Sequence, residues 1–219
     1  MPMDMRFKDI KVCIWDFDGT LYKPNPDLWI KIREAEYQVI MDHTHWDKNR
    51  TIFEFDKTYK KVLQSATETV ARLCGITTEA AALEMEKHYD RRVYLVGDEL
   101  LIKLFQGLKN FRHLILANGV SSKIEEALVI LGVPRETFEI IITSELTGVN
   151  KPSEIPFQYV LHTTNLPAAN HLMIGDRELV DLTPAKKMGM KTCLVWSEEP
   201  SKIADVTLKT VYEVEKLLL

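Results

Sequence analysis

Trp15-Asp16-Phe17-Asp18-Gly19-Thr20 ends the first strand that the sequence predicts. The apolar run Lys11–Phe17 is rich in β-forming residues and passes directly into Asp-Gly-Thr, a pattern typical of a buried strand followed by a turn. Ligands of open α/β sheets bind at the carboxyl ends of the strands, so Asp16 and Asp18 are expected at a ligand site. The alternative is a simple strand-end turn, because acidic residues and glycine are common in turns.

Four further apolar runs lie downstream, at His113–Ala117, Glu139–Thr143, His171–Ile174 and Lys191–Trp196. Amphipathic helical patterns separate or follow them, at Ser121–Leu131, Glu154–His162, Leu179–Met188 and Thr210–Leu218. Strands that alternate with helices imply parallel βαβ units. We therefore expect an α/β fold whose core is a doubly wound parallel sheet of the Rossmann-like kind.

One long region interrupts this alternation. Between the first two predicted strands the pattern is helical, with apolar residues three or four positions apart in Asp27–Asp42, Thr51–Leu73 and Thr78–Val93. We therefore expect an inserted all-helical domain, placed as a cap, at residues 23–107 and a Rossmann-like core at residues 1–22 and 108–219. The two connections are candidate hinges, because lids commonly turn on a few residues at the ends of elements.

The composition is that of an ordinary globular protein and disfavours several function classes. With 28 basic and 32 acidic residues, the net charge is −4 and the pI is about 5.9, which disfavours a nucleic-acid polymer as a partner. No apolar run approaches the roughly 20 residues that span a bilayer, so no membrane partner is expected. Three cysteines without C-x-x-C spacing favour reduced thiols and a cytoplasmic location. The oligomeric state stays open.

The carboxyl pair Asp16 and Asp18 suits phosphoryl transfer. A strand-end carboxylate can attack phosphorus and form an aspartyl phosphate. A second carboxyl group two residues later can protonate the leaving oxygen and then accept a proton from the hydrolytic water. Both groups would repel a phosphate, so a divalent cation is expected to balance the charge.

On a buried first strand, Asp16-Phe17-Asp18-Gly19-Thr20-Leu21 resembles the first motif of the haloacid-dehalogenase-like hydrolase superfamily, hydrophobic-D-x-D-G-[TV]-[LI]. The resemblance implies Asp16 as the nucleophile and Asp18 as the acid/base. Dehalogenases of this superfamily generally lack the second aspartate, so Asp18 favours phosphoryl transfer over dehalogenation. A helical insertion between the first and second motifs is similar to the superfamily's first type of cap.

The third motif of the superfamily is a lysine, often followed by proline, before a helix. Asn150-Lys151-Pro152-Ser153 resembles it closely. The resemblance implies that Lys151 places a positive charge against the nucleophile and the transferring phosphoryl oxygens, as a catalytic and phosphate-binding residue. For an isolated Lys-Pro pair, a surface lysine would be the simpler interpretation, and the order of the motifs favours the catalytic one.

Gly175-Asp176-Arg177-Glu178-Leu179-Val180-Asp181 resembles the fourth motif, G-D-x(4)-D. The resemblance implies that Mg²⁺ is held by the Asp176 carboxylate, the Asp16 carboxylate and the Asp18 main-chain carbonyl, in the oxygen environment that this ion prefers. Asp181 would support a metal-bound water or the catalytic lysine. The plainer alternative is that Asp176 and Asp181 are favourable charges near a helix N-terminus.

The second motif departs from the superfamily, because Ala117 stands where a serine or threonine hydroxyl usually binds a phosphoryl oxygen. Asn118 and Gly119 match the usual pattern, and their backbone N–H groups are expected to bind phosphate. The side chains of Asn118, Ser121 and Ser122 are candidate substitutes for the hydroxyl. Loss of one transition-state donor typically costs about 2.7–4 kcal/mol, so Ala117 predicts a weaker enzyme.

Together these motifs predict a magnesium-dependent phosphatase that hydrolyses a small phosphorylated metabolite through an aspartyl-phosphate intermediate. Two alternatives stay open. One is a phospho-ligand-binding or regulatory protein with weak catalysis, which Ala117 motivates, and the other is a sugar phosphomutase, which shares the D-x-D pair. Nucleotides, sugar phosphates and phosphoglycolate all stay open as substrates.

Several side chains outside the motifs carry weaker signals. The aromatic residues of the cap are expected to pack between its helices, with one or two lining a substrate pocket as the alternative: Trp29, Tyr37, Phe53, Phe55 and Tyr59. Arg33, Arg91 and Arg92 are expected on solvated faces, with contact to an anionic group of the substrate as the alternative. Arg177 either contacts the substrate or holds Glu178, and the sequence does not decide between these roles.

Overall fold

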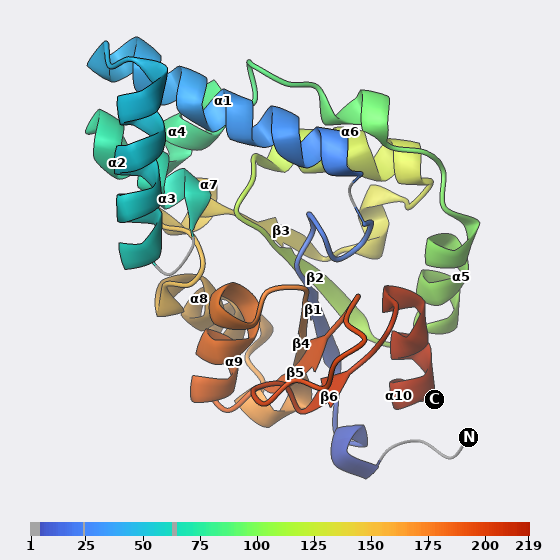
Figure 1. Ribbon diagram of the computed structural model, residues 1–219. Coiled ribbons are helices and arrows are strands. Elements are labelled where there is room, and N and C mark those ends of the chain that lie inside the picture. The colour runs from blue at the N-terminus through green and yellow to red at the C-terminus, as the bar shows by residue number, and fades with distance from the viewer. Residues whose placement is uncertain (1–4, 24, 63–64) are drawn as a thin grey trace.

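The computed structural model describes residues 5–23, 25–62 and 65–219, and in these ranges it contains one six-stranded sheet in the order β3-β2-β1-β4-β5-β6 (Figure 1). Its strands are β1 (Val12–Trp15), β2 (Arg112–Leu116), β3 (Ile140–Ile142), β4 (His171–Gly175), β5 (Lys191–Leu194) and β6 (Val206–Thr207). All neighbouring strands of this sheet are parallel, which confirms the predicted α/β class with a Rossmann-like core.

Helices cover both faces of the sheet (Figure 1). One face carries α5 (Glu99–Gly107), α6 (Ser121–Leu131), the 3-10 turn η6 (Val211–Val214) and α10 (Glu215–Leu218). The other face carries α8 (Glu154–Thr164), the π-helical turn η5 (Glu178–Leu182) and α9 (Thr183–Lys187). The connections include α7 (Ser144–Thr147), η1 (Met5–Phe7), η3 (Arg135–Thr137) and η4 (Ala168–Asn170). The helix predicted at Leu179–Met188 is therefore a wider, π-helical turn followed by the short helix α9. The helix predicted at Thr210–Leu218 is a tighter, 3-10 turn followed by the short helix α10.

β1 lies near the middle of the sheet, and its side chains alternate between the two faces. Cys13 and Trp15 join the hydrophobic cluster under α5 and α6, whereas Val12 and Ile14 join the cluster under α8 and α9. All four side chains are fully buried. Burial on both faces explains why this strand is a continuous apolar run in the sequence.

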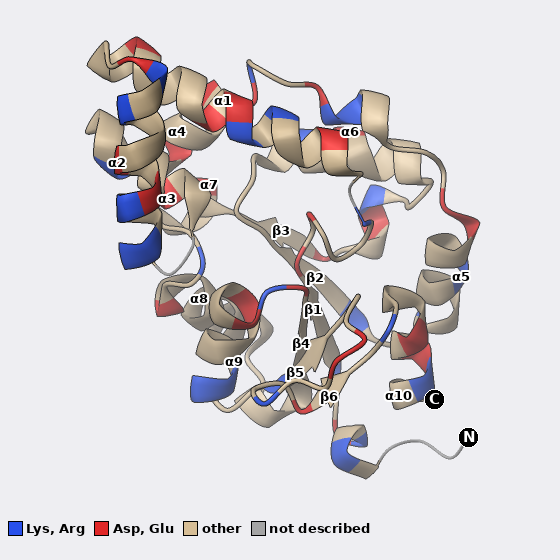
Figure 2. Cartoon of the chain, in the orientation of Figure 1, with Lys and Arg blue, Asp and Glu red and all other residues tan. Residues whose placement is uncertain are grey.

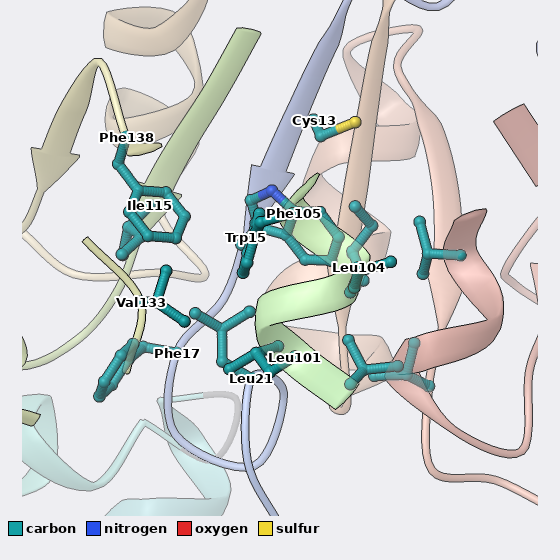
Figure 3. Close-up of a cluster of buried hydrophobic side chains, with 14 of the residues drawn as sticks. Cys13, Trp15, Phe17, Leu21, Leu101, Leu104, Phe105, Ile115, Val133 and Phe138 are labelled. Carbon is teal, nitrogen blue, oxygen red and sulfur yellow. The ribbon is translucent and has the colours of Figure 1, made fainter. Parts of the chain in front are cut away.

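Trp15 is the centre of the larger cluster (Figure 3). Its ring centroid lies 5.2 Å from that of Phe105 in an edge-to-face arrangement, and its indole N–H donates a 3.1 Å hydrogen bond to Nδ1 of His113. An aromatic pair of this kind contributes about 0.5–1.5 kcal/mol beyond the burial of its area. Because Phe105 belongs to α5, the contact ties this helix to the central strand that carries Asp16.

The chain between β1 and α5 folds as α1 (Pro26–Thr44), α2 (Lys48–Lys61), α3 (Ala66–Cys74), α4 (Thr78–Met85) and the 3-10 turn η2 (Arg91–Tyr94). α1 to α4 enclose a hydrophobic cluster of their own, which includes Val39, Ile40, Phe55 and Val70. The Arg33 guanidinium lies 4.4 Å from the Phe55 ring centroid, so this arginine packs on the aromatic cluster as well as reaching solvent.

Two helices of this region are shorter than predicted. Thr51–Leu73 is not one helix, because α2 ends at Lys61 and the extended backbone of Ser65 precedes α3, with residues 63–64 outside the described residues. Thr78–Val93 is not one helix either, because α4 ends at Met85 and the chain then turns to bring Arg91 inward.

The division into a core of residues 1–22 and 108–219 and a cap of residues 23–107 stays a prediction. We propose that α5 is part of the core, because Leu101, Leu104 and Phe105 share the hydrophobic cluster of Trp15. Basic and acidic residues are interspersed over the helices of both regions (Figure 2). Across the described residues, no helix has the length and apolar character that crossing a membrane requires.

Burial also keeps the thiols of the cysteines protonated. Cys13 and Cys193 are fully buried in the cluster of Trp15, and burial raises the pKa of both thiols far above the ordinary value. Cys74, at the end of α3, is half-buried, and its pKa is raised to about 11, chiefly by burial. All three are free thiols.

Candidate active site

Asp16 follows β1 directly and keeps the register of the sheet, since its N–H donates a 2.9 Å hydrogen bond to the Ile174 carbonyl of β4. The Thr20 hydroxyl donates to Asp16 Oδ2 at 3.0 Å. Gly19 turns the chain with a φ of +89°, and a Cβ there would lie 2.5 Å from Asp176 Oδ2. Glycine is therefore required at this position, both for the left-handed backbone and for the close approach of Asp176.

Lys151 is the buried cation of the site. Its Nζ donates 2.7 Å hydrogen bonds to Asp16 Oδ1 and to Asp181 Oδ1, and its side chain has no solvent exposure. Burial opposes the charge, but the fields of Asp16 and Asp181 outweigh it and raise the pKa of Lys151 above its ordinary value. We call Lys151, Asp16 and Asp181 the Lys151 cluster.

Asp176 completes a group of three carboxylates. One oxygen each of Asp16, Asp176 and Asp181 lie within 4.8 Å of one another. Burial, and then the neighbouring charges of Asp16 and Asp181, raise the pKa of Asp176 to about 8. Its Oδ1 is buried and has no hydrogen-bond partner in the described part of the chain. An orphaned carboxylate oxygen in a crowded acidic site is the environment that a hard divalent cation such as Mg²⁺ would stabilise, so these residues fit the predicted metal.

The Asn118 side chain was a candidate substitute for the hydroxyl that Ala117 lacks, but it bonds the backbone of Lys151 instead. Its amide nitrogen donates to the Lys151 carbonyl at 2.8 Å, and its Oδ1 accepts from the Lys151 N–H at 2.9 Å. Ser121 does not cap α6, because the N-cap residue is Val120, without a side-chain hydrogen bond. The Ser121 hydroxyl instead lies 3.2 Å from the Thr143 hydroxyl.

The carboxylate of Asp18 is held from the helical insertion. Arg91 Nη1 donates to both of its oxygens, at 2.9 and 3.2 Å, and the Tyr22 hydroxyl donates to Oδ1. Arg91 Nη2 in turn bonds Glu86 and, at 2.9 Å, the Tyr89 hydroxyl. We call Arg91, Asp18, Glu86 and Tyr89 the Arg91 cluster.

The expectation of a solvated Arg91 is therefore wrong, whereas it is right for its neighbour. The Arg91 side chain is 3% exposed and that of Arg92 is 52% exposed. In the sequence the two are an undistinguished basic pair. The one available signal was position, because η2 lies where the insertion returns to the core.

A small cavity of about 100 Å³ lies between core residues and residues of the helical insertion. Its core wall includes Asp16, Asp18, Ala117, Asn118, Gly119 and Arg177. Its other wall comes from the insertion and includes Trp29, Ile32, Glu36, Glu86 and Arg91. The predicted site residues Asp16, Asp18, Asn118 and Gly119 thus share one cavity, while Lys151, Asp176 and Asp181 lie beside Asp16. Their catalytic roles stay predictions.

A family model for haloacid dehalogenase-like hydrolases matches residues 10–189, so the chain belongs to this family, as its motifs predicted. It is similar to the glyceraldehyde 3-phosphate phosphatase of Methanocaldococcus jannaschii, with 26% identity over 94% of this chain and 95% of the relative. It is also similar to the phosphoglycolate phosphatase of Colwellia psychrerythraea, with 25% identity over 78% of each chain.

Among solved structures, the fold is similar to that of a haloacid dehalogenase-like phosphatase from Thermococcus onnurineus, with a TM-score of 0.64. The similarity covers 95% of this chain and 97% of the other, at 19% sequence identity. This likeness concerns the fold, and it extends over both the sheet and the helical insertion.

Proposed function

We propose that the protein is a magnesium-dependent phosphatase that hydrolyses a small phosphorylated metabolite through an aspartyl phosphate on Asp16. The observation that carries the proposal is the setting of Asp16, which lines the cavity, accepts a hydrogen bond from the Lys151 ammonium and lies in one group of carboxylates with Asp176, whose Oδ1 is unpaired among the described residues. Two relatives are named as phosphatases of short phosphate esters, which supports the same class of substrate.

In the first step, an Asp16 oxygen attacks phosphorus, and the bond from phosphorus to the ester oxygen breaks. Asp18 gives a proton to the departing alkoxide oxygen. In the second step, water attacks the same phosphorus, Asp18 takes a proton from it, and the bond to the Asp16 oxygen breaks to release phosphate. Lys151 stabilises negative charge beside Asp16 in both steps, since it lies 2.7 Å from Asp16 Oδ1.

The other residues prepare this chemistry. Asp16, Asp176 and the Asp18 main-chain carbonyl would hold Mg²⁺, which supplies positive charge against the phosphoryl oxygens. Asp181 fixes Lys151 through its 2.7 Å hydrogen bond. The backbone N–H groups of Asn118 and Gly119 are available for phosphoryl oxygens. The small cavity favours a short ester and limits the water that reaches it.

Replacing the nucleophile tests the proposal. Asp16→Asn is expected to lower the rate of magnesium-dependent phosphate release from p-nitrophenyl phosphate by on the order of 10⁴-fold or more. Asp56→Asn is the matched control, because Asp56 is an exposed acid on α2. Equal rates for wild type and Asp16→Asn would contradict the mechanism. A screen of short phosphate esters with the wild type would then identify the substrate.

Ala117 favours a second candidate, a phospho-ligand-binding or regulatory protein with weak catalysis, because the site lacks one hydroxyl donor. Magnesium-dependent binding of vanadate without turnover of any phosphate ester would select it. The sugar phosphomutase also stays open, and analysis of sugar phosphate products, as isomer or free phosphate, separates it from hydrolysis. The cytoplasmic location and the absence of nucleic-acid and membrane partners stay predictions.

A further inference from the structure

The residues predicted to bind phosphate offer few side-chain donors that are free to bind a phosphoryl group. Lys151 is engaged by Asp16 and Asp181, and both ends of the Asn118 amide are engaged by the backbone of Lys151. Ala117 has no polar side-chain atom. Besides backbone N–H groups, these residues therefore leave a phosphoryl group only the third N–H of the Lys151 ammonium.

Two guanidinium groups line this cavity among the residues that the structure describes, and they differ in their engagement. Arg91 is bound by Asp18, Glu86 and Tyr89. Arg177 makes no hydrogen bond through its guanidinium to any described residue, and its contact with Asp176 Oδ1 is an ion pair at 4.0 Å. That separation is too long for a hydrogen bond, so the five N–H donors of Arg177 are uncommitted.

The strand order places Arg177 beside the nucleophile. Asp16 follows β1, Ala117 follows β2 on one side, and Arg177 follows β4 on the other side (Figure 1). Its own N–H donates to Asp181 Oδ2 at 3.2 Å, which fixes where the side chain starts. A guanidinium stays protonated at ordinary pH, so Arg177 is a cation, and its side chain is 37% exposed.

We infer that Arg177 is a further catalytic residue, which binds the transferring phosphoryl oxygens and takes over the function of the hydroxyl that Ala117 lacks. A guanidinium offers two parallel donors to a phosphoryl group, and this fork would supply both the missing hydrogen bond and a positive charge. The inference rests on the proposed phosphatase function, because it assumes that a phosphoryl group occupies the cavity.

Arg177→Gln tests it by two measurements. The kcat for p-nitrophenyl phosphate is expected to fall about 10²–10³-fold, as for other lost transition-state donors. Calorimetry with inorganic phosphate and saturating Mg²⁺ is expected to show affinity on the order of 10- to 100-fold weaker. Arg177→Lys keeps the charge without the two parallel donors, and its kcat and phosphate affinity are expected to lie between those of the wild type and of Arg177→Gln. Arg72→Gln, at an arginine of α3 whose side chain is 60% exposed, is the matched control.

A titration with Mg²⁺ alone separates this role from mere support of the aspartates. Binding of phosphate to Arg177 predicts that Arg177→Gln binds Mg²⁺ as tightly as the wild type or more tightly, since a nearby cation has been removed. A parallel loss of Mg²⁺ and phosphate affinity would overturn the inference, as would unchanged kcat and phosphate affinity. Failure of the wild type to bind phosphate would overturn it too.

Ala117→Ser completes the experiment. Restoring the hydroxyl is expected to raise kcat at least tenfold more in the Arg177→Gln protein than in the wild type, because the wild type already has its donor. Equal gains in both backgrounds would show that Arg177 does not replace the hydroxyl. If the wild type binds phosphate with Mg²⁺ but releases none from any ester, the phosphatase proposal fails, and the phosphate affinity of Arg177→Gln still decides the role of Arg177.

Discussion

The Lys151 cluster and the Arg91 cluster are both built around a buried cation, but they differ in what surrounds it. The Lys151 side chain is 0% exposed, and its partners Asp16 and Asp181 are 4% and 0% exposed. The Arg91 side chain is 3% exposed, but its partner Asp18 is 29% exposed. The first cluster is closed to water, whereas one member of the second still reaches it.

The two clusters also differ in the elements that build them. Asp16 directly follows β1, Asp181 lies in η5 after β4, and Lys151 lies in the turn before α8, so all three residues of the Lys151 cluster come from the part of the chain that surrounds the sheet. Arg91, Glu86 and Tyr89 come from the helical insertion and reach across to Asp18. The comparison teaches that the nucleophile is fixed by the core, whereas the acid/base candidate is oriented only while the insertion lies against it.

Breaking the Lys151 cluster is expected to have the largest effect on stability. Lys151→Met leaves Asp16 and Asp181 buried without their cation, and such a loss costs about 3–5 kcal/mol. Urea unfolding of the metal-free proteins measures the difference. Lys209→Met removes a lysine from an exposed pair with Glu198 and is expected to leave the stability unchanged. A loss no larger than that of the control would contradict the closed character of the cluster.

A buried acid outside both clusters sharpens the contrast. Burial raises the pKa of Glu36 from 4.5 to about 7, although Arg33 and Arg177 oppose the shift. The pKa of Glu36 is higher in the folded protein than in the unfolded chain. The contribution of protonated Glu36 to the free energy of unfolding is therefore fully present below about pH 4.5 and is lost as the pH rises through 7. The difference of 2.5 in pKa corresponds to about 3 kcal/mol.

Glu36→Gln is therefore expected to be up to about 3 kcal/mol more stable than the wild type at pH 8, and equally stable near pH 4.5. Unfolding by urea at several pH values measures this difference. A gap between the two proteins that does not change from pH 5 to pH 8 would show that Glu36 does not titrate in this range.

Breaking the Arg91 cluster is expected to cost less than breaking the Lys151 cluster. Arg91→Met leaves Glu86, whose side chain is 8% exposed, without its cation, but Asp18 is 29% exposed and water can solvate it again, so we expect a loss of about 2 kcal/mol. Arg92→Met, at the exposed neighbour, is the control in the same unfolding experiment. If Arg91→Met costs as much as Lys151→Met, the difference in exposure does not matter.

Much of the core site was predictable from sequence because Asp16 ends a buried strand, where ligands of parallel sheets bind, and because the other residues match motifs of the superfamily. Asp16, Lys151, Asp176 and Asp181 belong to three of these motifs, and the structure brings them together. The sequence did not reveal that the Asn118 side chain bonds the backbone of Lys151. An asparagine at this position can bond either a phosphate or a neighbouring backbone, and the sequence does not distinguish the two.

The Arg91 cluster was not predictable, because it depends on where the insertion lies. Arg91 and Asp18 are 73 residues apart, and no periodicity connects them. Solvation is the ordinary fate of an arginine, so the sequence favoured an exposed side chain. The break between α2 and α3 was missed for a related reason, since helical spacing continues through Ser65 while the backbone there is extended.

The buried cysteines have a practical consequence for chemical labelling. A thiol reacts with alkylating reagents as its thiolate, and burial suppresses that form at Cys13 and Cys193 and also at the half-buried Cys74. We therefore expect the three cysteines of the native protein to react very slowly with such reagents. A single cysteine introduced on the exposed face of α1 would take up a fluorescent or spin probe selectively, and a second one on the core would give a pair whose separation measures any movement of the insertion relative to the sheet.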